Sequence, residues 1–139
     1  MQNWIPHHHA DKLWLVSRVL VGVMFFLHGA QKFGLTGGEP ATMWTLMWWA
    51  GLVELVVGVL TVLGLLTMVA SALGGIQMLV AYFTVHFDWP SALNPLTNKG
   101  ELALLYFGAF LVLLAWGAGR YSVDALLCPQ KKAMHGKHK

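Results

Sequence analysis

A single carboxylate lies inside a long apolar segment of this chain. Glu54 is near the middle of residues 44–66, and no other formally charged residue lies between Glu39 and Asp88. An ionised side chain near the centre of a bilayer is costly unless it is paired, hydrated or protonated. We therefore expect Glu54 to belong to a functional site, where it takes up or releases a proton for a bound redox molecule.

Arg18 is the first expected partner of Glu54. Glu54 lies ten residues after Trp44, and Arg18 lies five residues after Leu13. With a helical rise of about 1.5 Å per residue and an apolar layer of about 30 Å, their depths differ by roughly 7 Å, which an extended Arg side chain can bridge. We therefore predict an Arg18–Glu54 ion pair, either as a structural pair that sets the helix register or as one that holds Glu54 ionised.

Further polar residues are expected in one layer near the outer ends of the helices. His28 and Lys32 close the first apolar stretch, His86 closes the third, and Glu101 begins the fourth. A quinone headgroup needs a hydrogen-bond donor for each carbonyl and a route for protons, which this layer can supply together with Glu54. The predicted catalytic residues are Glu54, His28 and Arg18, and the predicted cofactor-binding residues are Lys32, His86 and Glu101. Two of these positions also have a plain structural explanation: Glu101 suits a helix N-terminus, and His86 suits a membrane boundary.

Other cofactors are less favoured by these residues. Two histidines at a membrane boundary, His28 and His86, are weak grounds for a haem, which needs two facing ligands. No His-x-x-x-His or Cys-x-x-Cys spacing suggests a metal site. Cys128 is the single cysteine, which excludes dithiol exchange within the chain. Quinone is therefore the expected cofactor, haem is not expected, and no metal site is predicted.

Four apolar stretches must position these residues. They cover residues 13–31, 44–66, 69–87 and 101–118, and a helix needs about 20 largely apolar residues to cross a bilayer. The composition agrees, since 57% of the residues are hydrophobic and 11% are charged, with a mean hydropathy of +0.60. We predict an all-α membrane protein, a four-transmembrane-helix bundle over residues 13–118, with an N-terminal segment (1–12) and a basic tail (119–139). In the third stretch, Gly74 and Gln77 belong to a stripe of small and polar residues that should face the bundle interior.

The basic residues predict the orientation in the membrane. Lysine and arginine gather near both chain ends, whereas the first and third loops contain only Lys32 and Lys99. The positive-inside rule then places both termini in the cytoplasm. Most of the net charge of +3 lies in a tail that would face anionic lipid. Membrane lipids are therefore expected partners, and nucleic acid is not.

Four motifs occur in order along the chain. They are His28-Gly29-x-x-Lys32, Gly51-x-x-Glu54-Leu55-x-x-Gly58, Lys99-Gly100-Glu101-Leu102-Ala103 and Gly117-Ala118-Gly119-Arg120-Tyr121-Ser122-Val123-Asp124. Together they resemble the DoxX family over residues 18–124, although Ala118 stands where the family ending usually has proline. By position, the polar signature of the family falls on Arg18, His28, Lys32, Glu54, Glu101, Arg120 and Asp124.

The resemblance implies a function as well as a fold. It implies a bacterial inner-membrane protein of four helices, related to DoxD, the small membrane subunit of thiosulfate:quinone oxidoreductase. Other members of the family are linked to membrane-associated oxidoreductase complexes that handle oxidative and thiol stress.

Two functional classes remain open. The first is a quinone-interacting subunit of an oxidoreductase complex, with other protein subunits or a second copy as partners. The second is a non-catalytic membrane scaffold or small-solute permease in which the Arg–Glu pair is structural. Nothing in the chain carries electrons stably, which favours a quinone site or a scaffold over an autonomous enzyme.

Overall fold

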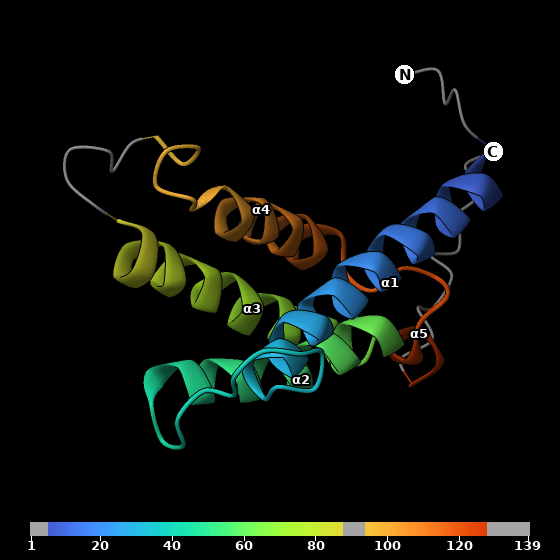
Figure 1. Ribbon diagram of the computed structural model, residues 1–139. Coiled ribbons are helices and arrows are strands. Elements are labelled where there is room, and N and C mark those ends of the chain that lie inside the picture. Colours follow the sequence, from blue (N-terminus) through green and yellow to red (C-terminus); the bar gives the residue numbers. More distant parts are fainter. Residues whose placement is uncertain (1–5, 88–93, 128–139) are drawn as a thin grey trace, which may run out of the picture.

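The computed structural model describes residues 6–87 and 94–127, and all regular structure within these ranges is helical (Figure 1). The helices are α1 (His7–Lys32), α2 (Leu46–Leu63), α3 (Thr67–Ala81), the π-helical turn η1 (Tyr82–His86), α4 (Glu101–Trp116) and α5 (Val123–Leu127). The predicted all-α class is confirmed.

Three helical segments are long and apolar enough to cross a membrane: His9–Lys32, Leu46–Leu63 and Thr67–His86. The fourth, α4, is also apolar but has 16 residues. At about 1.5 Å per residue it is roughly 24 Å long, shorter than the apolar layer of a typical bilayer. The four predicted spans are thus three long helices and a shorter fourth. The first helix begins at His7, ahead of the expected boundary at residue 13.

The turn between α2 and α3 is built from unusual backbone conformations. Gly64 ends α2 with a φ of 64°, in the left-handed region that glycine adopts without strain. Leu66 also has a positive φ, of 48°, just before α3 begins. Asp124 supports this turn from α5, because its carboxylate accepts hydrogen bonds from the backbone N–H groups of Leu66 (2.7 Å) and Thr67 (2.9 Å). A carboxylate at this position also complements the dipole of α3.

The four long helices form two antiparallel pairs, α1 with α2 and α3 with α4 (Figure 1). Glycines allow the first pair to approach closely. A Cβ atom on Gly22 would lie 2.8 Å from the backbone nitrogen of Val62, and one on Gly58 would lie 2.7 Å from that of Phe26. Small residues of this kind let membrane helices pack backbone against backbone. We call the end of the bundle that carries the α1–α2 and α3–α4 connections the loop end, and the opposite end the α5 end.

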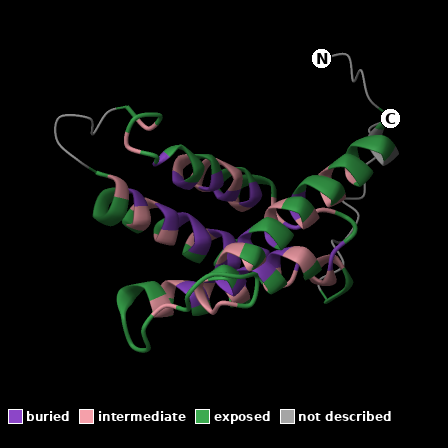
Figure 2. Ribbon diagram, in the orientation of Figure 1, coloured by how far each residue is buried: buried purple, intermediate pink, exposed green. Residues whose placement is uncertain are grey.

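The hydrophobic core lies where the two pairs meet. Phe25, Val57 and Phe110 are at most 1% exposed and belong to one cluster of buried side chains. Buried residues follow the facing sides of the helices, and exposed residues follow the outer sides (Figure 2). These outer sides carry large apolar side chains such as Leu20 and Leu105, which are 60% and 62% exposed. Apolar outer surfaces are what helices in contact with lipid require.

Candidate functional site

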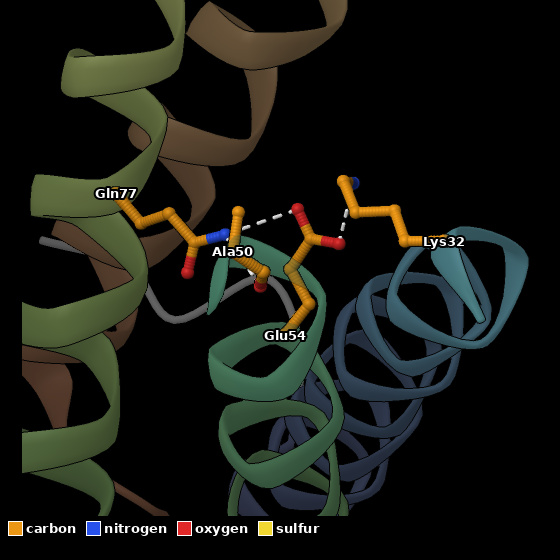
Figure 3. Close-up of polar contacts among 4 residues, drawn as sticks. All are labelled: Lys32, Ala50, Glu54 and Gln77. Carbon is orange, nitrogen blue, oxygen red and sulfur yellow. Dashed lines mark hydrogen bonds and ion pairs between the residues drawn. The ribbon is translucent and has the colours of Figure 1, made fainter. Parts of the chain in front are cut away.

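Glu54 lies on the inner side of α2 and is 3% exposed. Lys32, in the last turn of α1, donates a hydrogen bond from Nζ to Glu54 Oε2 at 2.6 Å (Figure 3). The side chains of Lys32 and Glu54 are 21% and 4% exposed, so the ion pair is largely removed from water. Gly51 makes room for it, because a Cβ atom there would lie 3.0 Å from the Lys32 side chain.

Gln77 on α3 completes the surroundings of the Glu54 carboxylate. Its amide nitrogen donates to Glu54 Oε1 at 3.1 Å and to the backbone oxygen of Ala50 at 3.0 Å (Figure 3). Both partners of the amide nitrogen are acceptors, and Lys32 supplies a cation on the other oxygen. The geometry is therefore that of an ionised carboxylate with a donor on each oxygen. The sequence placed Gln77 on an inward stripe but did not identify it as a site residue.

Glu54 borders a cavity of about 710 Å³ between the helices. This volume is within the range of small-molecule sites in proteins. Every long helix contributes to the lining, which is mostly apolar, with side chains such as Val53, Leu73, Ile76 and Leu102. The titratable residues of the lining are His28, Lys32, Glu54, His86, Lys99 and Tyr106.

The two predicted histidines both reach this cavity. His28 on α1 lies edge-on to the ring of Tyr106, with 5.6 Å between the ring centroids. His86 lies in η1, a π-helical turn of the kind often found at functional sites. Its Nδ1 is 3.2 Å from the backbone oxygen of Asn98, so Nδ1 carries the hydrogen and Nε2 remains available to another group. Within the described ranges, no group of three or more His, Cys, Asp or Glu is placed to hold a metal ion.

The predicted Arg18–Glu54 ion pair is wrong. Arg18 is 2% exposed and donates to backbone oxygens at the α5 end: those of Ala118, Tyr121 at 2.8 Å and Val62 at 3.4 Å. The cause is the register of α1 against α2, which places the Arg18 guanidinium beside Gly64. Gly64 lies ten residues after Glu54, about 15 Å along the helix. Arg18 therefore closes the α5 end, and its expected catalytic role stays a prediction.

The remaining predicted residues lie outside the cavity. Glu101 is exposed at the first position of α4 and does not contribute to the lining, so its role in cofactor binding stays a prediction. Arg120 Nη1 is 3.9 Å from Asp11 Oδ2 in an exposed ion pair. Cys128 and the rest of the basic tail after it, residues 129–139, lie outside the described residues. Lys99 and Tyr106 are lining residues that the sequence did not single out, since neither breaks the pattern of its segment.

The family of the chain is shown by comparison with known proteins. A family model for DoxX matches residues 13–87. This chain belongs to the DoxX family. Membership of this family and the long apolar helices together show that the DoxX protein is a multi-pass membrane protein.

Two relatives of this DoxX protein are uncharacterised proteins of Haemophilus influenzae. One is 39% identical over 113 residues, which cover 77% of this chain and 84% of the relative. The other is 34% identical over 74 residues, which cover 53% and 48% of the two chains. No solved structure matches this DoxX protein significantly.

Proposed function

We propose that this protein is a redox-associated membrane subunit that binds a quinone in the cavity beside Glu54. The observation that carries the proposal is a buried carboxylate, held between Lys32 and Gln77, at the edge of a largely apolar cavity of about 710 Å³. An intramembrane ionisable group that faces the bundle interior is a functional site by default. A purely structural ion pair would not require the open space beside it.

The residues of the cavity fit a quinone. Its flat ring and apolar tail suit the aliphatic lining, and its two carbonyl oxygens need hydrogen-bond donors. His28 can supply one donor, since no described residue bonds its ring nitrogens, and His86 can supply another from Nε2 when it is protonated. Lys99, exposed and at the border of the same cavity, adds a cation.

Proton handling is the chemistry that the chain itself contributes. A bound quinone supplies the electron chemistry, because it takes up or releases two electrons and two protons. Glu54 and His28 exchange protons with the bound molecule, while Lys32 favours the ionised form of the Glu54 carboxylate between transfers and fixes its orientation. A partner subunit of an oxidoreductase complex would exchange the electrons with the bound quinone.

The proposal includes a location. The distribution of Lys and Arg supports an orientation with both termini in the cytoplasm, and membership of the DoxX family supports a bacterial inner membrane. The cavity then opens in the half of the membrane remote from the cytoplasm, within reach of quinones dissolved in the bilayer.

Binding of a short-chain quinone to the purified protein tests the proposal. Trp49 lines the cavity, so quenching of tryptophan fluorescence by ubiquinone-1 in lipid nanodiscs provides the readout. Glu54→Gln should weaken binding about tenfold or more, which corresponds to about 1.4 kcal/mol. The matched control is Glu39→Gln, the same substitution in the exposed first loop, which should bind as the parent does. Equal affinity in both variants would remove Glu54 from the site, and no saturable quenching in the parent would refute quinone binding.

A further inference from the structure

The cavity beside Glu54 is closed toward the α5 end. Its lining on α2 ends at Glu54, and its lining on α4 ends at Tyr106. Helices α1 and α3 run toward the loop end, antiparallel to α2 and α4. On α1 the lining begins at Phe25, and on α3 it begins at Leu73. The described lining therefore reaches from the loop end to about one helical turn past Glu54, where Phe25 and Leu73 lie, and the carboxylate is close to the floor of the cavity.

The floor is densely packed and apolar. Phe25 and Phe110 meet edge to face, with ring centroids 4.8 Å apart. Val57, one turn after Glu54, is 1% exposed in the same cluster. Gly74 packs directly against the Phe110 ring, since a Cβ atom there would lie 2.6 Å from a ring carbon. Water needs polar partners to occupy an interior, and the side chains of Phe25, Val57 and Phe110 offer none.

A second buried polar layer lies beyond this floor, toward the α5 end. The side-chain oxygens of Thr61, Thr67 and Ser71 are buried and have no hydrogen-bond partner within the described part of the chain, and neither has Nε of Arg18. Buried polar atoms of this kind are usually satisfied by internal water. Thr61 lies seven residues after Glu54, about 10 Å along α2, with the apolar floor between them.

Polar groups lead from Glu54 in the opposite direction. Lys32 and His28 on α1 and Tyr106 on α4 border the cavity nearest the carboxylate, and His86 and Lys99 border it nearer the loop end. Thr45, Thr84 and Lys99 of the lining are exposed.

We propose that Glu54 exchanges protons only with the loop end of the bundle, and that Phe25, Val57 and Phe110 form the seal that separates it from the α5 end. The inference rests on the proposed function, since it describes how the quinone site communicates with water. It makes the site single-sided: protons taken up or released there come from, or go to, one face of the membrane.

Cysteine accessibility tests this sidedness. Cys128→Ser gives a background without cysteine, because the chain has one. In that background, Val53→Cys reports on the cavity and Ser71→Cys reports on the layer beyond the seal. Glu39→Cys and Arg120→Cys, both at exposed positions, mark the loop end and the α5 end. Each variant is treated in sealed vesicles with a membrane-impermeant maleimide, added outside or trapped inside.

We expect Val53→Cys to react from the Glu39→Cys side at least about tenfold faster than from the Arg120→Cys side. The thiolate is the form that attacks the maleimide, and a thiol ionises only where it is in contact with water. Ser71→Cys should show the opposite preference or remain unlabelled. Equal rates from both sides at Val53→Cys, faster labelling from the Arg120→Cys side, or no labelling at all would overturn the inference.

Two additions separate this inference from the proposed function. Ubiquinone-1 should slow labelling of Val53→Cys; if it does not while the sidedness holds, quinone binding fails and the seal stands. Phe110→Ala in the Val53→Cys background should admit label from the Arg120→Cys side, and Phe110→Leu, which keeps more of the volume, should admit less. If Phe110→Ala does not fold, the sidedness of Val53→Cys alone decides.

Discussion

Removal of Lys32 should be among the most destabilising single changes to a polar residue. Lys32→Met keeps the aliphatic part of the side chain but leaves the Glu54 carboxylate, 4% exposed, without the cation 2.6 Å away. Loss of one member of a buried ion pair typically costs about 3–5 kcal/mol, because the other charge remains buried and uncompensated. Gln77 remains as a neutral donor, so we expect a loss near the lower end of this range, about 3 kcal/mol.

The free energy of unfolding in mixed micelles of mild detergent and SDS measures this loss, and two further variants make it specific. Lys32→Met combined with Glu54→Gln should be at least about 1 kcal/mol more stable than Lys32→Met alone, since no charge is then stranded. Arg120→Met removes the cation of the Arg120–Asp11 ion pair, in which the two charged groups are 3.9 Å apart and the side chains are 73% and 34% exposed. This change should cost less than about 1 kcal/mol. If Lys32→Met costs no more than Arg120→Met, Glu54 is not held as a buried ion.

Two further predictions concern packing and the α5 end. Gly58→Ala should destabilise the protein by about 1–3 kcal/mol, since the added Cβ atom would lie 2.7 Å from the Phe26 backbone. In the same unfolding assay Gly108→Ala should be neutral or stabilising by up to about 1 kcal/mol, because a Cβ atom at Gly108 would have no neighbouring atom within 4 Å. Burial raises the pKa of Asp124, but hydrogen bonds from Thr67 and Leu66 and the charge of Arg18 outweigh it and bring this pKa below the ordinary value of 3.8. The stabilisation by ionised Asp124 is thus present above pH 3.8 and is lost as the pH falls through the lowered pKa. Asp124→Asn should therefore cost about 1 kcal/mol at neutral pH and make the free energy of unfolding less sensitive to acid. An unchanged dependence of unfolding on pH would contradict the capping role of Asp124.

The sequence was sufficient to predict the helical class and much of the cavity. Helical spans follow from the length of the apolar runs, and the cost of a charge in lipid already requires Glu54 to face the interior. His28, Lys32 and His86 lie at the ends of their helices on the same side of the bundle, so helix lengths alone place them in one layer. In the structure all three lie on the lining of the cavity with Glu54, and their role in binding a cofactor stays a prediction.

The partner of Glu54 could not be predicted from helix lengths. The expected depths of Arg18 and Glu54 start from separate boundaries at Leu13 and Trp44, whereas α1 begins at His7 and α2 at Leu46. The actual register depends on how the backbones of α1 and α2 approach at Gly22 and Gly58, which is a property of the packed pair. The hydrogen bonds between Asp124 and the start of α3 could not be predicted either, because they require the chain to return to the start of α3 after α4 ends.

The two cations of α1 suit their different places. Arg18 is buried among backbone oxygens at the α5 end, where a guanidinium offers several donors in one plane. Lys32 is a compact ammonium beside the cavity, 21% exposed, and holds one oxygen of the carboxylate while the other bonds Gln77. A guanidinium with several backbone partners therefore anchors the α5 end, and the groups able to exchange protons lie nearer the loop end. The same division of α1 accounts for the position of the apolar seal, since Phe25 lies midway between Arg18 and Lys32 on the helix that carries both.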